Sequence, residues 1–269
     1  MKIIKSLFII TLAAIAIPTM AARVSVQTKG MSLVLDVENG QPAKYLYFGH
    51  RIQPHDVSAL SEATNGRMDA YPAYGMNTPY EAAFAMRHAD GNLSTQLIVA
   101  GQEVKEEANA TVTTIHLKDK IYPLLVDLKY RAYKDVDVME AWTEITNQER
   151  GKVVLTNFAS MMLPIRRGNV YATHFYGAWA NEAQVVEEKL NPGQLVVANH
   201  EGIRNSHTDH AEMLFSLDGK VREESGDVIG AALCYSGNYK LKAVTDETDY
   251  HYFFAGIDAD NSEYHLKKG

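Results

Sequence analysis

The chain has 269 residues, 46% of them hydrophobic and 22% charged, and 33 acidic residues outnumber 26 basic ones. This composition is typical of a globular protein and excludes a disordered, collagen-like or low-complexity chain. The acidic excess argues against a nucleic-acid partner, which needs a basic face. The single cysteine excludes both an intramolecular disulfide and a Cys-rich zinc site. We expect no metal and no cofactor.

The first residues have the pattern of a secretory signal peptide. Lys2 and Lys5 precede an apolar stretch, Leu7–Ile17, and small residues follow around Ala21. This order of basic start, apolar centre and small-residue exit favours a cleaved signal over a buried N-terminal helix. The apolar stretch is also shorter than the roughly 20 residues of a membrane span. We therefore predict a signal peptide over 1–21 and an exported chain, periplasmic or secreted, that has no membrane contact after cleavage.

The rest of the chain predicts β-strands. In 126–133, Val126, Leu128, Tyr130 and Ala132 alternate with polar residues, which is the period of a half-buried strand. Similar short runs are 32–37, 44–48, 95–99, 111–117, 138–146, 153–162, 195–198, 228–235, 239–244 and 250–257. Turn residues such as Asn39-Gly40 and Asp218-Gly219 separate them. We predict an all-β protein, a large sandwich, with 22–269 as one domain.

Three segments depart from this pattern. The segment 53–80 contains Pro54, Pro72, Gly75 and Pro79, and it predicts a long loop, of which about 69–80 projects from the sandwich. Residues 182–190 fit two helical turns. Cys234 lies in an apolar run, which favours a buried, inert thiol over a nucleophile.

A His-rich stretch is the first candidate site. It comprises His200-Glu201 and, a few residues later, Ser206-His207-Thr208-Asp209-His210. The His-x-x-His spacing with an acid between could ligate a metal, but no third ligand stands at a recognisable distance. A polar loop whose imidazoles bond to the backbone and a set of sugar contacts remain as alternatives.

A pair of glutamates is the second candidate. Glycosidases need two carboxylates, and Glu140 and Glu144 flank Trp142 on an alternating run. An aromatic face beside carboxylates suits a sugar, but a core tryptophan with solvated edges is the favoured interpretation. The sequence has no Gly-x-Ser-x-Gly motif and no Gly-rich phosphate loop between a strand and a helix.

Several segments together resemble one family. Ala70-Tyr71-Pro72-Ala73-Tyr74-Gly75 resembles the Tyr-Pro…Gly loop in the N-terminal domain of glycoside hydrolase family 36, the α-galactosidases. Further segments that resemble the family, in its order, are Tyr80–Phe84, His88–Asn92, Tyr176–Glu182, Leu190–Gly193, Asn205–His207 and Gly230–Asn238. Each match alone is weak, but the ordered set is specific and spans most of the chain.

The resemblance implies a β-supersandwich of the galactose-mutarotase-like type. It also implies a catalytic (β/α)8 barrel after this domain, with an aspartate nucleophile in a Lys-aromatic-Asp triplet and a second aspartate as acid/base. This sequence has no such triplet and ends at Gly269. We therefore expect the front third of such an enzyme, as a separate or truncated product, with no catalytic residue of its own.

The resemblance also indicates where a sugar would bind. The family's Gly-Asp-Phe-Arg, which reaches towards the substrate pocket, is replaced here by Asn77-Thr78-Pro79-Tyr80, and its Gly-x-Trp-x-Arg-Glu has Asn181 in place of Arg. Both departures weaken the inference that this domain helps to bind galactosides as its relatives do. The residues expected to contact a galactose-containing oligosaccharide, weakly, are Asp69, Tyr71, Tyr74, Asn77, Tyr80, Trp179 and His207.

Three functions compete. The first is a non-catalytic domain that supports the barrel polypeptide, oligomerisation and galactoside binding. The second is a stand-alone carbohydrate-binding module. The third is a mutarotase-type epimerase, for which His174, His200, His207 and Glu201 supply an acid and a base. The ordered motifs favour the first.

Overall fold

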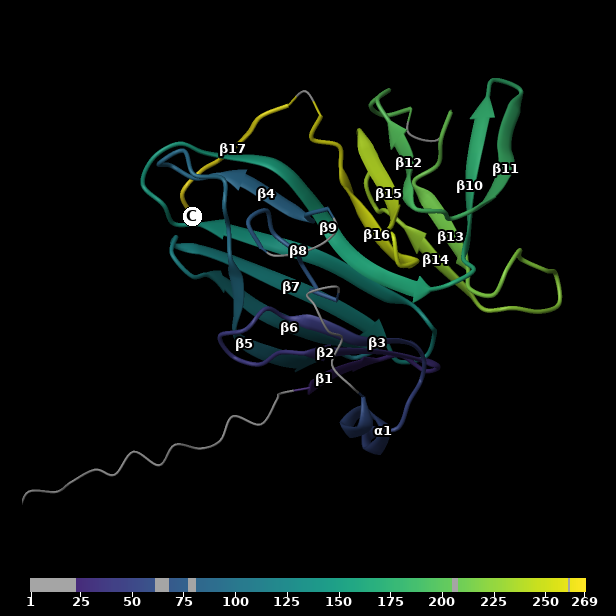
Figure 1. The fold of residues 1–269 in the computed structure, drawn as a ribbon, viewed down its shortest axis with the longest axis horizontal. Helices are drawn as coiled ribbons and strands as arrows, with labels where there is room; N and C mark the ends of the chain where they lie inside the picture. The colour runs from purple at the N-terminus through teal and green to yellow at the C-terminus, as the bar shows by residue number, and fades with distance from the viewer. Residues whose placement is uncertain (1–22, 61–67, 77–80, 205–207, 261) are drawn as a thin grey trace, which may run out of the picture.

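A computed structural model describes residues 23–60, 68–76, 81–204, 208–260 and 262–269 (Figure 1). The predicted signal peptide, Asn77, Tyr80 and His207 lie outside these residues. The described chain forms seventeen strands and one short helix, α1, Pro54–Ala59. Over these residues the structure holds no helix with the length and apolarity that a membrane crossing requires. The predicted all-β supersandwich is confirmed.

Two antiparallel sheets contain most strands of the N-terminal half of the chain. The first has the order β1-β2-β3 and the second β5-β6-β7-β8. Their strands are β1 Arg23–Gln27, β2 Met31–Asp36, β3 Lys44–His50, β5 Leu97–Glu106, β6 Ala110–Asp119, β7 Leu124–Tyr133 and β8 Met139–Asn147. The apolar positions of β7, including Val126, Leu128 and Tyr130, are buried, while Asp127 and Lys129 are partly exposed. The period-two pattern therefore gave the correct strand and the correct buried face.

Two further sheets complete the fold. A six-stranded sheet has the order β12-β15-β16-β9-β17, with β4 also paired to β9, and a four-stranded sheet has the order β11-β10-β13-β14. Their strands are β4 Phe84–Arg87, β9 Val153–Arg167, β10 Tyr171–Ala178, β11 Asn181–Lys189, β12 Gly193–Asn199, β13 Glu212–Ser216, β14 Val228–Ala232, β15 Tyr239–Thr245, β16 Tyr250–Ile257 and β17 Tyr264–Leu266. Figure 1 shows the long strand β9 between the first two sheets and β10–β14.

Buried side chains from all four sheets form one core. The phenol oxygen of Tyr45 on β3 lies 2.9 Å from that of Tyr130 on β7 and donates to the carbonyl of Met162 on β9 at 2.8 Å. Phe215 on β13 and Phe253 on β16 meet edge to face, with ring centroids 5.2 Å apart. Aromatic contacts thus join the sheets, and the hydroxyl groups of the two tyrosines have hydrogen-bond partners in the core.

Two expectations from the sequence are wrong. Residues 182–190 form most of β11 instead of a helix; β11 is the edge strand of its sheet and largely exposed, so it has no apolar stripe to mark its period. Cys234 is exposed instead of buried. Its apolar run belongs to the other edge strand, β14, which ends at Ala232, and alternate residues of β14 face solvent.

Candidate functional site

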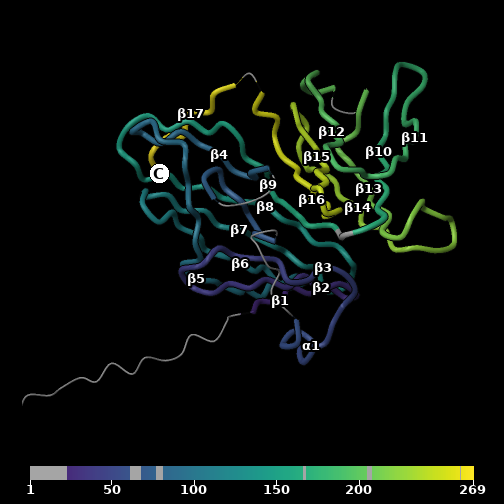
Figure 2. Tube along the Cα trace, viewed as in Figure 1, coloured from purple at the N-terminus to yellow at the C-terminus, as the bar shows by residue number. Residues whose placement is uncertain are grey.

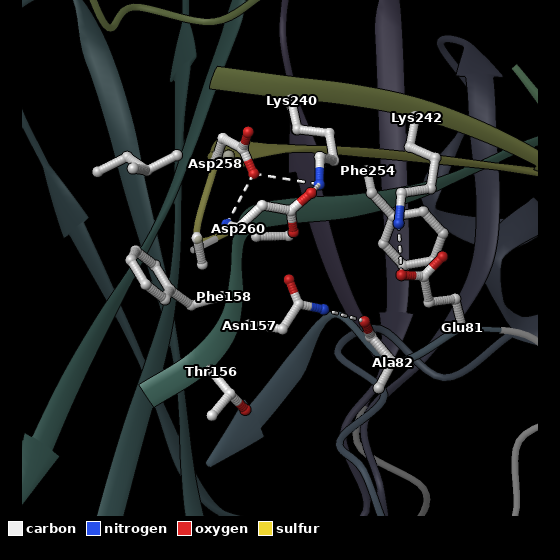
Figure 3. A pocket seen from close by; sticks show the side chains of 15 residues that line it. Glu81, Ala82, Thr156, Asn157, Phe158, Lys240, Lys242, Phe254, Asp258 and Asp260 are labelled. Carbon is white, nitrogen blue, oxygen red and sulfur yellow. Dashed lines mark hydrogen bonds and ion pairs between the residues drawn. The ribbon is translucent and has the colours of Figure 1, made fainter. Parts of the chain in front are cut away.

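A polar hollow of about 220 Å³ opens beside β9, β15 and β16 (Figure 3). The charged residues that line it come from three distant parts of the sequence. Glu81 precedes β4, Lys240 and Lys242 share one face of β15, and Asp258 and Asp260 follow β16. We call this site, with Asn157 and Phe158 of β9, the polar hollow.

The charges of the polar hollow are paired. Lys242 donates to Glu81, and Lys240 lies 3.1 Å from Asp258 and 2.5 Å from Asp260 (Figure 3). Burial disfavours the ammonium of Lys240, but its hydrogen bonds to the two aspartates outweigh burial and raise its pKa. The same bond to Lys240 lowers the pKa of Asp260. Lys240 and Asp260 therefore stay ionised at neutral pH.

Backbone geometry shapes the floor of the polar hollow. The register of β16 against β9 shifts between Ala255 and Gly256, which marks a β-bulge. A Cβ at Gly256 would lie 2.8 Å from the carbonyl oxygen of Phe158, so the close approach of the two strands requires glycine. On β9, the side-chain amide of Asn157 donates to the carbonyl of Ala82 at 2.8 Å, which fixes the orientation of this side chain.

The structure corrects the expectation that the whole loop around Asp69 and Tyr71 projects from the sandwich. Tyr71 is 3% exposed, packs against Phe84 and donates to the carbonyl of Ala159 at 2.7 Å. Asp69 is 5% exposed and pairs with Lys44 across an isolated bridge. The ring of Tyr71 therefore has no face on which a sugar could stack. Its neighbours Pro72 and Gly75 look like loop residues in sequence, although this part of the chain is held against β4.

The burial of Asp69 predicts a pH effect. Burial raises its pKa from 3.8 to about 6, although Lys44 opposes the shift. The folded state therefore holds this proton more tightly than the unfolded state, so stability is lost as the pH rises from about 4 to about 6. We expect Asp69→Asn to raise the melting temperature at pH 7.5 and to leave it nearly unchanged at pH 3.5. Asp135→Asn, at an exposed aspartate, is the control; equal effects of the two substitutions at both pH values would contradict the assignment.

The other predicted contact residues do not form one site in the described chain. Tyr74 is 54% exposed and bonds through its backbone to Phe84 and Thr95, next to β4. Trp179 is 84% exposed and lies in the turn between β10 and β11, which belong to a different sheet. The remaining predicted contacts, at positions 77, 80 and 207, fall on residues that the structure does not describe.

The two parts of the His-rich stretch lie in two places. His200, after β12, lies 3.0 Å from Asp258 at the edge of the polar hollow, whereas Asp209 forms an isolated bridge with Tyr176 on β10. His174, on the same strand β10, lies 3.4 Å from Glu188 on β11. Burial raises the pKa of Asp209, although His174 and His210 nearby oppose the shift. Among the described residues, no group of three or more His, Cys, Asp or Glu side chains could hold a metal ion.

The residues of the polar hollow were not predicted from the sequence. The alternation of Lys240 and Lys242 places both on one face of a strand, and that signal was available. The pairing of Lys242 with Glu81 could not be predicted, because Glu81 lies 161 residues earlier and contacts Lys242 only in the folded chain.

Comparisons with known proteins identify the domain. The sequence profile of the Glycosyl hydrolase family 36 N-terminal domain matches residues 41–267. Alpha-galactosidase 1 of Pediococcus pentosaceus is 26% identical over 89% of this chain and 37% of its own length, and Alpha-galactosidase Mel36A of Lactobacillus acidophilus is 24% identical over 88% and 37%. The chain thus spans little more than a third of these relatives.

Solved structures have the same fold. The α-galactosidase of Lactobacillus brevis superimposes with a TM-score of 0.80 at 22% identity, over 91% of this chain and 37% of that protein. The family 36 α-galactosidase AgaA of Geobacillus stearothermophilus, in a variant complexed with stachyose, gives a TM-score of 0.84 at 18% identity, over 92% and 39%. The predicted resemblance is confirmed: this chain belongs to the family of glycosyl hydrolase family 36 N-terminal domains.

Proposed function

We propose that the chain is the non-catalytic supersandwich domain of an exported α-galactosidase-like glycoside hydrolase. It supports a catalytic barrel and oligomerisation, and it binds galactosides weakly. The observation that carries this proposal is the family match over 41–267, together with relatives named α-galactosidases that are more than twice as long. In this account the catalytic residues belong to the barrel, and the supersandwich contributes packing and sugar contacts.

One end of the molecule supports the docking role. Four large apolar side chains there are exposed: Tyr176 by 49%, Trp179 by 84%, Ile203 by 90% and Tyr235 by 41%. Figure 2 shows the β10–β11 turn and the chain after β12 at this end. We call these four residues the apolar end. Aromatic residues are enriched in the centres of protein interfaces, and clustered exposed apolar side chains mark interaction sites.

Backbone hydrogen bonds hold the segments of the apolar end together. The amide of Gly177 donates to the carbonyl of Thr208 at 2.6 Å, and the amide of Leu233 donates to the carbonyl of Ala211 at 2.8 Å. Asn238 accepts from the amide of Gly202 at 2.8 Å. The three segments that carry the apolar side chains are therefore positioned relative to one another. A preorganised surface of this kind loses little conformational entropy on docking.

Binding to a catalytic segment tests this proposal. The chain would be titrated with the separately produced catalytic segment of Alpha-galactosidase 1 of Pediococcus pentosaceus, and association would be measured by sedimentation. We expect a complex, and we expect Trp179→Ser to weaken it at least about tenfold, because a buried interface tryptophan is a typical hot spot. Ile121→Ser, at an apolar side chain that is 75% exposed elsewhere, is the matched control. No association, or equal weakening by both substitutions, would contradict the docking role.

A further inference from the structure

The charges of the polar hollow restrict what it can bind. An anion such as a phosphate would meet the carboxylates of Glu81, Asp258 and Asp260, and a cation would meet the ammonium groups of Lys240 and Lys242. A neutral molecule with several hydroxyl groups avoids both conflicts, because each hydroxyl can donate to a carboxylate or accept from an ammonium. The paired charges of the polar hollow stay hydrated when no ligand is bound. The hydroxyl groups of a bound ligand can replace that water.

Polar atoms surround the hollow from several directions. Figure 3 shows Lys242 with Glu81 on one side, Lys240 with Asp260 on another, and the side-chain oxygen of Asn157 directed into the space between them. The amide nitrogen of Asn157 is engaged by Ala82, so this orientation is fixed. A carboxylate offers about four acceptor positions and an ammonium three donors, which exceeds what a single ion pair uses. Convergent donors and acceptors of this kind give orientation to a bound polyol.

The size and the apolar surface of the polar hollow further limit which ligand it can bind. The volume of about 220 Å³ lies below the roughly 300–1,000 Å³ of sites for drug-sized ligands, which indicates one ring instead of a chain of rings. Phe158, which is partly exposed, lines the hollow and provides apolar surface for the C–H groups of a sugar ring.

We propose that the polar hollow binds one neutral pyranose unit, held by Lys242, Glu81, Asp260 and Asn157. This inference deepens the proposed galactoside binding by giving it a place, and it rests on that part of the proposed function. The polar hollow is lined by residues of β9, β15 and β16 and of the chain beside them, and it shares no lining residue with the four side chains of the apolar end.

Titration of the full chain with D-galactose, followed by calorimetry and amide chemical shifts, tests the proposal. We expect binding, with shifts at residues 240–242 and 256–260, and at least a tenfold loss of affinity in both Lys242→Met and Asp260→Asn. Asp260 is exposed, so its substitution leaves the core intact. Lys118→Met, at an exposed strand lysine, should bind as the unsubstituted chain does. Melting curves would verify that each variant is folded.

The possible outcomes separate this inference from the proposed function. If D-galactose binds equally to the unsubstituted chain and to both variants, the sugar site lies elsewhere and only the polar hollow is refuted. If neither D-galactose nor D-glucose binds, the polar hollow and the proposed galactoside binding both fail, while docking to a catalytic segment is still judged by sedimentation. Tighter binding of galactose 1-phosphate than of galactose would contradict the neutral-ligand claim.

Discussion

Replacing Phe253 by alanine is expected to lower the free energy of unfolding by about 3–5 kcal/mol, the range for loss of a buried phenylalanine. Phe253 is 1% exposed on β16, and its ring meets Phe215 of β13 at an interplanar angle of 66°. The contact joins the six-stranded sheet to the sheet that contains β10 and β11. The substitution leaves a cavity between two sheets and removes an edge-to-face pair that adds about 0.5–1.5 kcal/mol.

Urea unfolding monitored by circular dichroism measures this loss. Ile121→Ala, at a side chain that is 75% exposed, is the control and should change stability by no more than about 0.5 kcal/mol. The two variants should keep the denaturant slope of the unsubstituted chain if unfolding remains two-state. A loss below about 1 kcal/mol for Phe253→Ala would show that the two sheets are not packed through this pair.

Every run predicted from the sequence overlaps a strand. In β7 the period of two reflects one buried face, whereas β2 and β16 are buried on both faces. Five strands were not predicted: β10, which is flanked by β11 and β13, and the short strands β1, β4, β13 and β17. The β11 edge strand was assigned to a helix because its residues are nearly all exposed and polar, so no periodic burial marked them.

Contacts between residues that are distant in the sequence explain the features that were not predicted. Tyr71 lies in a segment whose Pro and Gly content is typical of an exposed loop. Its ring is nevertheless buried, because β4 and β9 lie beside it. The polar hollow likewise depends on the meeting of β15 with the chain before β4. Alternation identifies the face that a side chain occupies, but it gives no information on which distant segment covers that face.

The second large effect concerns catalysis. We expect the purified chain to leave α-galactosides unhydrolysed, since rate enhancements of at least about 10⁶ need positioned acid and nucleophile groups. The family's nucleophile and acid/base are implied to lie in the barrel. The local alternative is Glu140 with Glu144 on β8. A glycosidase acid must hold a proton at the working pH, which requires a raised pKa.

Neither glutamate has that property. Glu140 accepts hydrogen bonds from Tyr133 at 2.8 Å and Arg131 at 2.7 Å, and these bonds lower its pKa. The pKa of Glu144 is lowered in the same way, first by its bond to Lys129 and then by the bond from the indole of Trp142. Both carboxylates are therefore ionised at neutral pH, and neither can donate the proton that a leaving sugar needs.

A steady-state assay of the pure chain with p-nitrophenyl α-D-galactopyranoside measures whether the supersandwich hydrolyses α-galactosides by itself. If the domain is non-catalytic, nitrophenol is released no faster than in buffer, and the Glu140→Gln and Glu144→Gln variants give the same result. Turnover by the unsubstituted chain that either substitution abolishes would show that the supersandwich itself is the enzyme.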